Sequence, residues 1–286
     1  MEMARPNNKR TLLWDWTLTR DHDTTPTLQA TTASLAKSLS SHRIASITNW
    51  NTWRPPELNP ADLPFRPMIR TPAQLEGGEW DMIRGSIDAE IQSGGGTGSV
   101  IVHTFNEPER IPLSIDDALR LWRTRILPLR QSHGSQRVKL VSPACASDAQ
   151  GSWWLDAFMD SLSLDSERDE RPDILGLHFY TMPDQTAEQG LAAAKTYFAE
   201  RRARFDVPVI VSELACTSRD SAVVNRFTRD LARWLEEPEQ DWVVEYGFFG
   251  VMREVADGFV SPATQMVDQE GAWTGLGRWW VGLEEE

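Results

Sequence analysis

The chain has 286 residues, of which 40% are hydrophobic and 25% are charged, and this composition excludes a wholly disordered protein. A formal net charge of −13 disfavours nucleic acid and membrane surfaces as partners, because both are anionic and repel an acidic protein. The count of 13 tryptophans is high beside three tyrosines and ten phenylalanines, and aromatic faces presented to a ligand are one explanation.

The N-terminal residues and the cysteines bear on the compartment. The first ten residues, MEMARPNNKR, lack the apolar core of a signal peptide, and no run approaches the roughly 20 apolar residues of a membrane span. The compartment stays open: secreted or wall-associated if a signal was removed, and cytoplasmic otherwise. Cys145 and Cys216 are too few for a disulfide framework or a four-ligand zinc site, and we expect buried free thiols over a disulfide. As a separate expectation, the protein is a monomer.

Short apolar runs alternate with amphipathic stretches along the chain, which is typical of strand–helix units. Several runs are almost continuously apolar, as in parallel strands that are covered on both faces. The runs that predict strands are 11–14, 44–47, 65–69, 99–105, 138–141, 174–179, 209–212 and 243–249. The stretches that predict helices, from apolar residues three and four apart, are 27–41, 79–92, 115–130, 153–164, 186–204 and 220–235.

Eight strands alternating with helices in this length predict an α/β protein, a single (β/α)8 TIM barrel over 1–286. The link between the second and third strands is short and holds four prolines between 55 and 64, so its helix should be missing or reduced to a turn. An open doubly wound sheet is the competing fold. However, no G-x-G-x-x-G follows the first strand, and the glycine-rich segment 94–98 precedes a strand instead.

Catalytic groups of such a barrel lie at the C-terminal ends of its strands. Glu107 follows the fourth strand in an NEP motif, and Glu213 follows the seventh. A charge at the end of an apolar run costs stability, so two of them at facing strand ends indicate a function. Paired carboxylates provide the acid and the nucleophile or base of glycoside hydrolysis. Glu109 is expected to cap the next turn, Glu245 is a weaker third candidate, and His103 suits either buried support or contact with the site.

The NEP motif after the fourth strand, with a glutamate after the seventh, resembles the clan A retaining (β/α)8 glycosidases. Within that clan the chain is similar to glycoside hydrolase family 128, the β-1,3-glucanases. The similarity extends over nearly the whole chain as an ordered set of motifs: TNWN at 48–51, PM at 67–68, FNEP at 105–108, SPA at 142–144, HFY at 178–180, SELA at 212–215 and YGFFG at 246–250.

The resemblance implies a retaining hydrolase of β-1,3-glucan with Glu107 as acid/base and Glu213 as nucleophile. It also implies that Asn106 binds the sugar 2-hydroxyl and that His178 and Tyr180 line the site. In that reaction Glu213 attacks the anomeric carbon while Glu107 protonates the leaving oxygen, and Glu107 then activates water. The chemistry requires no metal or organic cofactor, and β-1,3-glucan or its oligosaccharides are the expected partner.

Three residues depart from the family pattern. The chain has Glu109 where relatives commonly have Asp, Phe179 where they often have Trp, and Arg70 where Trp follows the Pro-Met pair. These changes leave both glutamates in place but alter the expected sugar platform, so endo and exo action both stay open.

Aromatic residues on the expected active face are candidates for sugar binding. Trp16, Trp50 and Trp154 are expected to stack on pyranose rings, with Asn49 and Phe248 as further contacts. The tryptophans in helices or at strand starts are expected to pack in the core: Trp122, Trp234, Trp242, Trp279 and Trp280.

Two alternative functions use the same residues. One is a clan A glycosidase that acts on another β-glycan, and the other is a glucan-binding protein with little turnover. Intact Glu107 and Glu213 favour an enzyme over the binding protein.

Overall fold

The structure is a computed structural model that describes residues 8–18, 33–39, 43–55, 63–93, 99–163, 170–255 and 258–284. Of the helix predicted over 27–41, residues 33–38 are helical and most of the rest lies outside the described residues. The glycine-rich segment 94–98 and most of the proline-rich link between the second and third predicted strands also lie outside them.

All eight predicted strands are present, and one of them is divided. The strand predicted over 65–69 becomes two short strands at Pro67, which has no N–H to donate to a neighbour. The strands are β1 (Arg10–Leu13), β2 (Ile44–Thr48), β3 (Phe65–Arg66), β4 (Met68–Ile69), β5 (Val100–Asn106), β6 (Val138–Ala144), β7 (Leu175–Tyr180), β8 (Val209–Ala215) and β9 (Val243–Phe248).

Every pairing between these strands is parallel, in the orders β3-β2-β1-β9-β8-β7 and β4-β5-β6. The two groups meet at both ends. The Pro67 carbonyl, between β3 and β4, accepts from the His103 N–H of β5 at 2.9 Å. Bridges from Val141 to Ile174 and from Cys145 to Leu177 join β6 to β7. The strands therefore succeed one another in chain order, as the predicted fold of the (β/α)8 type requires.

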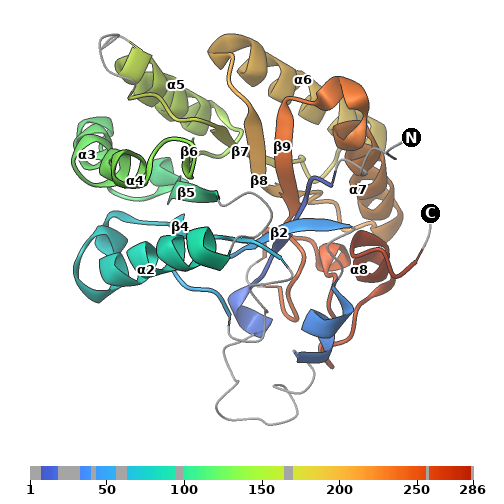
Figure 1. Ribbon diagram of the computed structural model, residues 1–286. Helices are drawn as coiled ribbons and strands as arrows, with labels where there is room; N and C mark the ends of the chain where they lie inside the picture. Colours follow the sequence, from blue (N-terminus) through green and yellow to red (C-terminus); the bar gives the residue numbers. More distant parts are fainter. Residues whose placement is uncertain are drawn as a thin grey trace, which may run out of the picture.

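Helices lie outside the strands and cover them (Figure 1). The helices are α2 (Gly77–Ser93), α3 (Ile115–Leu121), α4 (Leu127–His133), α5 (Ala149–Ser163), α6 (Ala187–Phe205), α7 (Ser221–Glu236) and α8 (Gly275–Trp280). The short α8 was not among the predicted helices. The helix predicted over 115–130 divides into α3, a π turn over Trp122–Ile126 and α4. The division precedes Pro128, which cannot donate a helical hydrogen bond.

An apolar cluster fills the barrel near the starts of the strands. It consists of Ile101, Val141, Ile174 and Ile210, with Val244 packed against it. Four of these side chains come from β5, β6, β8 and β9, and Ile174 directly precedes β7, so they close the interior on the side away from the site.

A buried polar layer lies in the same interior. The carboxylate of Glu245, on β9, pairs with Arg66 at 2.6 Å and accepts from the hydroxyls of Ser46 at 2.6 Å and Thr11 at 3.1 Å. Burial opposes the ionisation of Glu245, but Arg66 and these hydrogen bonds hold its pKa below the ordinary value. Glu245 is therefore a paired charge of the interior, and its partners leave it no evident catalytic role.

Two smaller expectations are tested by the described residues. Cys145 and Cys216 are buried free thiols, as predicted. Burial, reinforced by Glu109, raises the pKa of Cys145 well above its ordinary value, which keeps this thiol protonated and unreactive. Of the helices in the described part of the chain, none combines the length and apolarity needed to cross a membrane.

Candidate active site

Glu107 stands at the end of β5 in an unusual backbone conformation. Its φ of 44° and ψ of 57° are left-handed, which is uncommon for a residue other than glycine and concentrated at functional sites. The Glu107 N–H donates to the Ala144 carbonyl at 2.8 Å, and its own carbonyl accepts from Arg110 N–H at 2.9 Å. These bonds hold the turn that directs the side chain toward the mouth of the barrel.

Glu213 is directed inward by an irregularity in β8. Leu177 of β7 pairs with Val211, but the next residue, His178, pairs with Glu213, so Ser212 is an extra residue. Such a bulge re-aims the side chains that follow it, and here it places Glu213 on the same face as His178. The residue Glu213 is 6% exposed, and its carboxylate accepts two hydrogen bonds. Trp50 Nε1 donates to Oε1 at 2.8 Å, and the Tyr180 hydroxyl donates to Oε2 at 2.7 Å.

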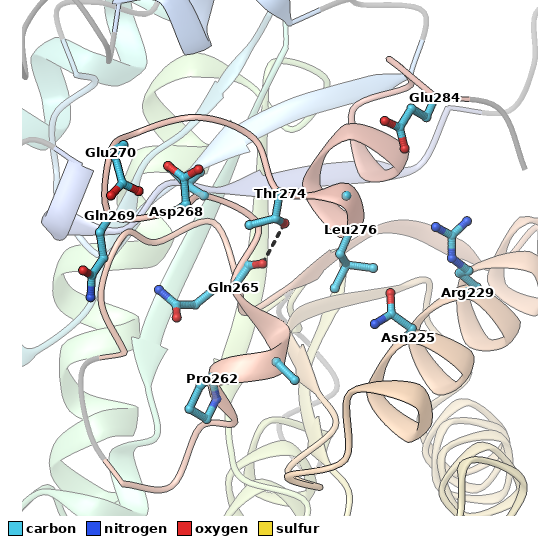
Figure 2. Close-up of a pocket in the computed structure, with 13 residues that line it drawn as sticks. Asn225, Arg229, Pro262, Gln265, Asp268, Gln269, Glu270, Thr274, Leu276 and Glu284 are labelled. Atoms are coloured by element: carbon cyan, nitrogen blue, oxygen red, sulfur yellow. Dashed lines mark hydrogen bonds between the residues drawn. The ribbon is translucent and has the colours of Figure 1, made fainter.

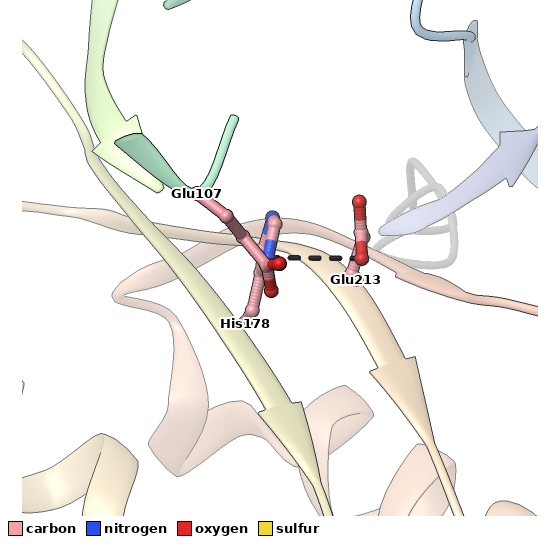
Figure 3. Close-up of side chains that lie close together, drawn as sticks. All are labelled: Glu107, His178 and Glu213. Carbon is pink, nitrogen blue, oxygen red and sulfur yellow. Dashed lines mark hydrogen bonds and ion pairs between the residues drawn. The ribbon is translucent and has the colours of Figure 1, made fainter. Parts of the chain in front are cut away.

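His178 lies between the two carboxylates (Figure 3). Its Nδ1 atom is 3.1 Å from Glu107 Oε1 and 3.7 Å from Glu213 Oε2. Burial disfavours the imidazolium, but the charge of Glu213 and the hydrogen bond to Glu107 raise the pKa of His178. Burial likewise opposes ionisation of Glu107, yet His178 and, more weakly, Arg110 lower its pKa. His178 and Glu107 therefore each favour the charged form of the other.

The same three side chains are spaced to hold a metal ion. One donor atom from each of Glu107, His178 and Glu213 lies within 4.8 Å of the other two, the one such group found within the described ranges. The alternative use of this spacing needs no ion, since His178 bridges the carboxylates and Trp50 and Tyr180 donate to Glu213. Hydrogen-bond donors of this kind stabilise a carboxylate anion directly.

Two cavities share Glu213 and Phe249 in their walls. The first, here called the Asn106 cavity, has a volume of about 530 Å³ and includes Asn106, Trp16 and Trp50. The second, the Glu107 cavity, has a volume of about 700 Å³ and includes Glu107, Tyr180, Met182 and Phe259. Glu213 thus lies where the two cavities meet, whereas Glu107 lines only the second.

Several residues predicted to contact sugar lie at these cavities. Trp16 is 51% exposed in the wall of the Asn106 cavity, where it can offer a ring face. Trp50 lies against the nucleophile candidate and meets Phe249 edge-on, with ring centroids 5.2 Å apart. Asn106 Oδ1 is buried and has no hydrogen-bond partner in the described part of the chain.

Three other predictions of direct sugar contact are wrong. Trp154 is 4% exposed and stacks on Phe158 in the core, because it lies on the inward face of α5. Phe248 is 2% exposed and packs against Trp280, since strand alternation turns it outward toward α8. Asn49 is buried and holds its own turn, with Nδ2 donating to Trp53 and Oδ1 accepting from Asn51 N–H.

The cavities also contain residues that the sequence did not single out. Phe249 lies in both walls, and Met182, Phe259, Arg110 and Asp148 lie in the Glu107 cavity. Phe249 could have been found, because it follows Phe248 and alternation gives neighbouring residues opposite directions. Phe259 lies outside the helices and strands of the described residues and carries no local signal.

The three departures from the family pattern have different places. Arg70 lines the Asn106 cavity and is exposed, so this change alters the site. Phe179 is buried against Tyr197 and Phe198 and also lies in the wall of the Glu107 cavity, so this change touches both the core and the site. Glu109 is buried and accepts from the Ala146 N–H at 2.9 Å, so its role is structural, but the segment that it holds follows β6 and is not the predicted next turn.

A separate cavity of about 700 Å³ lies between α7 and the segment 262–276 (Figure 2). Asn225 and Arg229 enter it from α7, and Thr274 donates to the Gln265 carbonyl at 2.8 Å on its other side. Its wall shares no residue with the two cavities at Glu213. The carboxylate pair therefore belongs to the other two cavities alone.

Residues 16–280 match a family model described as the glycosyl hydrolase catalytic core. Among solved structures, an exo-β-1,3-glucanase of glycoside hydrolase family 128, subgroup VI, from Aureobasidium namibiae is 36% identical, with a TM-score of 0.78 over 97% of each chain. A curdlan-specific exo-β-1,3-glucanase of subgroup III from Blastomyces gilchristii is 19% identical, with a TM-score of 0.65 over 97% of this chain and 99% of that one.

An oligosaccharide-binding protein of subgroup VII from Cryptococcus neoformans is also 19% identical, with a TM-score of 0.59 over 97% of this chain and 94% of that one. The two more distant structures establish the fold alone. No curated protein matches the chain. The family model and the 36% identity extend over nearly all of the sequence that builds the barrel and its carboxylate pair. The chain is thus a glycoside hydrolase and belongs to glycoside hydrolase family 128.

Proposed function

We propose that this protein hydrolyses β-1,3-glucan with retention of configuration, with Glu213 as the nucleophile and Glu107 as the acid/base. The observation that carries the proposal is the spacing of the two carboxylates, which have oxygens within 4.8 Å of each other. Retaining glycosidases hold their carboxyl groups about 5–5.5 Å apart, whereas inverting enzymes need about 6.5–9.5 Å to admit a water molecule.

The surroundings of the two carboxylates support different roles. Two donors, Trp50 and Tyr180, stabilise Glu213 as an anion, which suits a nucleophile. The Glu107 side chain is 27% exposed and hydrogen-bonds to His178, so it can exchange protons with both the imidazole and the cavity. These are the properties of a group that gives up a proton in one step and accepts one in the next.

The reaction then follows two balanced steps. Glu213 bonds to the anomeric carbon as the glycosidic bond breaks, and the proton of Glu107 passes to the departing oxygen. Water next attacks the same carbon, its proton passes to Glu107, and the bond to Glu213 breaks. The anomeric carbon retains its configuration because each of the two steps inverts it.

The two cavities suit opposite parts of the substrate. The leaving chain occupies the Glu107 cavity, because the proton donor lies in that wall alone. The transferred glucosyl part occupies the Asn106 cavity, where the unpartnered Asn106 Oδ1 and the exposed face of Trp16 can contact it. The 36% identity to an exo-β-1,3-glucanase supports β-1,3-glucan as the substrate and release from a chain end as the mode.

The experiment compares wild type, Glu107→Ala, Glu213→Ala and the control Glu188→Gln, a change at an exposed position on α6, on laminari-oligosaccharides. We expect NMR to show that the β-anomer of the product forms first, and a short oligosaccharide or monosaccharide product to be present from the start of the reaction. Both alanine variants should lose at least about 10³-fold in kcat. With β-laminaribiosyl fluoride as the donor, whose leaving group needs little acid assistance, azide should restore Glu213→Ala with an α-glycosyl azide product and Glu107→Ala with a β-glycosyl azide product. Initial formation of the α-anomer, or full activity in either alanine variant, contradicts the proposal.

A further inference from the structure

We propose that this protein also transfers glucosyl groups to a second β-1,3-linked oligosaccharide, which binds in the Glu107 cavity and competes with water for the glycosyl-enzyme. The inference rests on the retaining mechanism proposed above, because only a covalent intermediate can be divided between two acceptors.

The position of Glu107 determines where an acceptor must bind. Whatever attacks the glycosyl-enzyme gives its proton to Glu107, so its hydroxyl must lie within hydrogen-bond reach of that carboxylate. Glu107 lines the larger cavity and is absent from the wall of the Asn106 cavity, whereas Glu213 lines both. Water and an acceptor sugar therefore compete for the same cavity after the first leaving group departs.

The wall of this cavity suits a sugar better than water. Phe259 is 54% exposed and Met182 is 63% exposed, although both are large apolar side chains. Exposed apolar surface of this kind in a cleft indicates a ligand with apolar faces, which the C–H faces of a pyranose provide. The Phe259 ring packs 5.1 Å from the Tyr180 ring at 57°, so the aromatic surface continues to the residue that holds Glu213.

Polar groups of the same wall can position the acceptor. Arg110 and Asp148 form an exposed ion pair that lines the Glu107 cavity. Its donors and acceptors face a volume of about 700 Å³, the larger of the two at Glu213, which is within the usual range for a small-ligand site. An oligosaccharide held by its C–H face and its hydroxyls has a much higher local concentration at the anomeric carbon than a free one.

The transfer step is balanced without any further reactant. The 3-hydroxyl oxygen of the acceptor's non-reducing unit bonds to the anomeric carbon as the bond to Glu213 breaks. Its proton passes to Glu107, which regenerates the acid for the next cycle. The product is a β-1,3-linked oligosaccharide longer than the acceptor by the transferred part.

The test uses β-laminaribiosyl fluoride as the donor, because the fluoride leaving group is too small to contact the exposed Phe259 ring. Laminaritriose is added as the acceptor over a range of concentrations, and fluoride release and chain length are measured. We expect products longer than the acceptor, in a share that rises with its concentration. Phe259→Ala should lower the ratio of transfer to hydrolysis about tenfold.

Two further variants separate binding in this cavity from a general effect. Phe259→Tyr should keep the transfer ratio, and Trp153→Ala, which removes a 64% exposed aromatic outside both cavities, should not alter it. Full-rate hydrolysis with no longer product at high acceptor concentration overturns the inference but leaves the proposed hydrolase intact. An unchanged transfer ratio in Phe259→Ala also overturns it. Absence of fluoride release from wild type removes the proposed function and this inference together.

Discussion

The Tyr180 hydroxyl donates a 2.7 Å hydrogen bond to Glu213 Oε2, from the strand that neighbours the strand of Glu213. Trp50 Nε1 donates to Glu213 Oε1 as well, so each oxygen of the carboxylate accepts one hydrogen bond from the protein. The hydrogen bond from Tyr180 to Glu213 therefore links the proposed nucleophile to the aromatic wall formed by Tyr180 and Phe259.

Removing the Tyr180 hydroxyl should weaken the reaction without unfolding the protein. A hydrogen bond to a charged group contributes about 1.5–3 kcal/mol, so Tyr180→Phe should lower kcat by about 10- to 100-fold. The matched control is Tyr197→Phe, because the Tyr197 hydroxyl is buried with no hydrogen-bond partner among the described residues. Steady-state kinetics on laminari-oligosaccharides should show wild-type kcat for Tyr197→Phe. Wild-type kcat in Tyr180→Phe as well would contradict the prediction.

His178 should set the upper pH limit of activity. Its hydrogen bond and charge lower the pKa of Glu107, so His178→Ala should raise that pKa. Glu107 must be protonated for the first step, and a higher pKa keeps it protonated to higher pH. The basic limb of the kcat/KM profile should therefore move to higher pH, whatever the loss in its height.

A matched control for this profile is His133→Ala, on the surface at the end of α4. It should leave both limbs in place. A basic limb that stays fixed or moves to lower pH in His178→Ala would show that another group determines the limit.

His103 should make the fold sensitive to acid. Burial lowers its pKa from 6.5 to about 4, with Glu245 opposing and Arg66 and His178 reinforcing the change. The unfolded chain then takes up a proton that the folded chain excludes, so stability is fully present above about pH 6.5 and falls toward pH 4. This loss amounts to about 3 kcal/mol, since each pKa unit is worth about 1.4 kcal/mol.

The measurement is the free energy of urea unfolding at pH 7 and at pH 4.5. The difference between the two values should be smaller in His103→Gln than in wild type, because glutamine does not titrate. An equal difference in both proteins would assign the acid sensitivity to other groups.

Trp16 and Trp154 should respond in opposite ways to truncation. Trp16 is half-exposed at the Asn106 cavity, so Trp16→Ala should weaken oligosaccharide binding about tenfold and leave the melting temperature unchanged. Trp154 is buried against Phe158, so Trp154→Ala should destabilise the fold by about 3–5 kcal/mol. Calorimetry of binding and of unfolding distinguishes them, and weaker binding with unchanged stability in Trp154→Ala would reverse our correction.

The aromatic residues show where local pattern ceases to be informative. Placing a tryptophan after a strand does not tell whether it faces the cavity or the core, because α5 carries Trp153 outward and Trp154 inward. Phe248 and Phe249 are adjacent and both apolar. Alternation predicts that they point in opposite directions, but the register of β9 against its neighbours decides which one faces the core and which the cavity. Phe259 lies beyond any periodic pattern, so no rule of alternation could have indicated it.

The sequence alone determined the class of fold and the two glutamates, because apolar periodicity and charges at strand ends are local properties. The tertiary structure decided how these groups meet. The extra residue in β8 turns Glu213 to the face of His178, and the left-handed turn at Glu107 directs the second carboxylate toward the same imidazole. Their spacing, and therefore the reaction they can perform, depends on contacts between strands far apart in the chain, which no local pattern specifies.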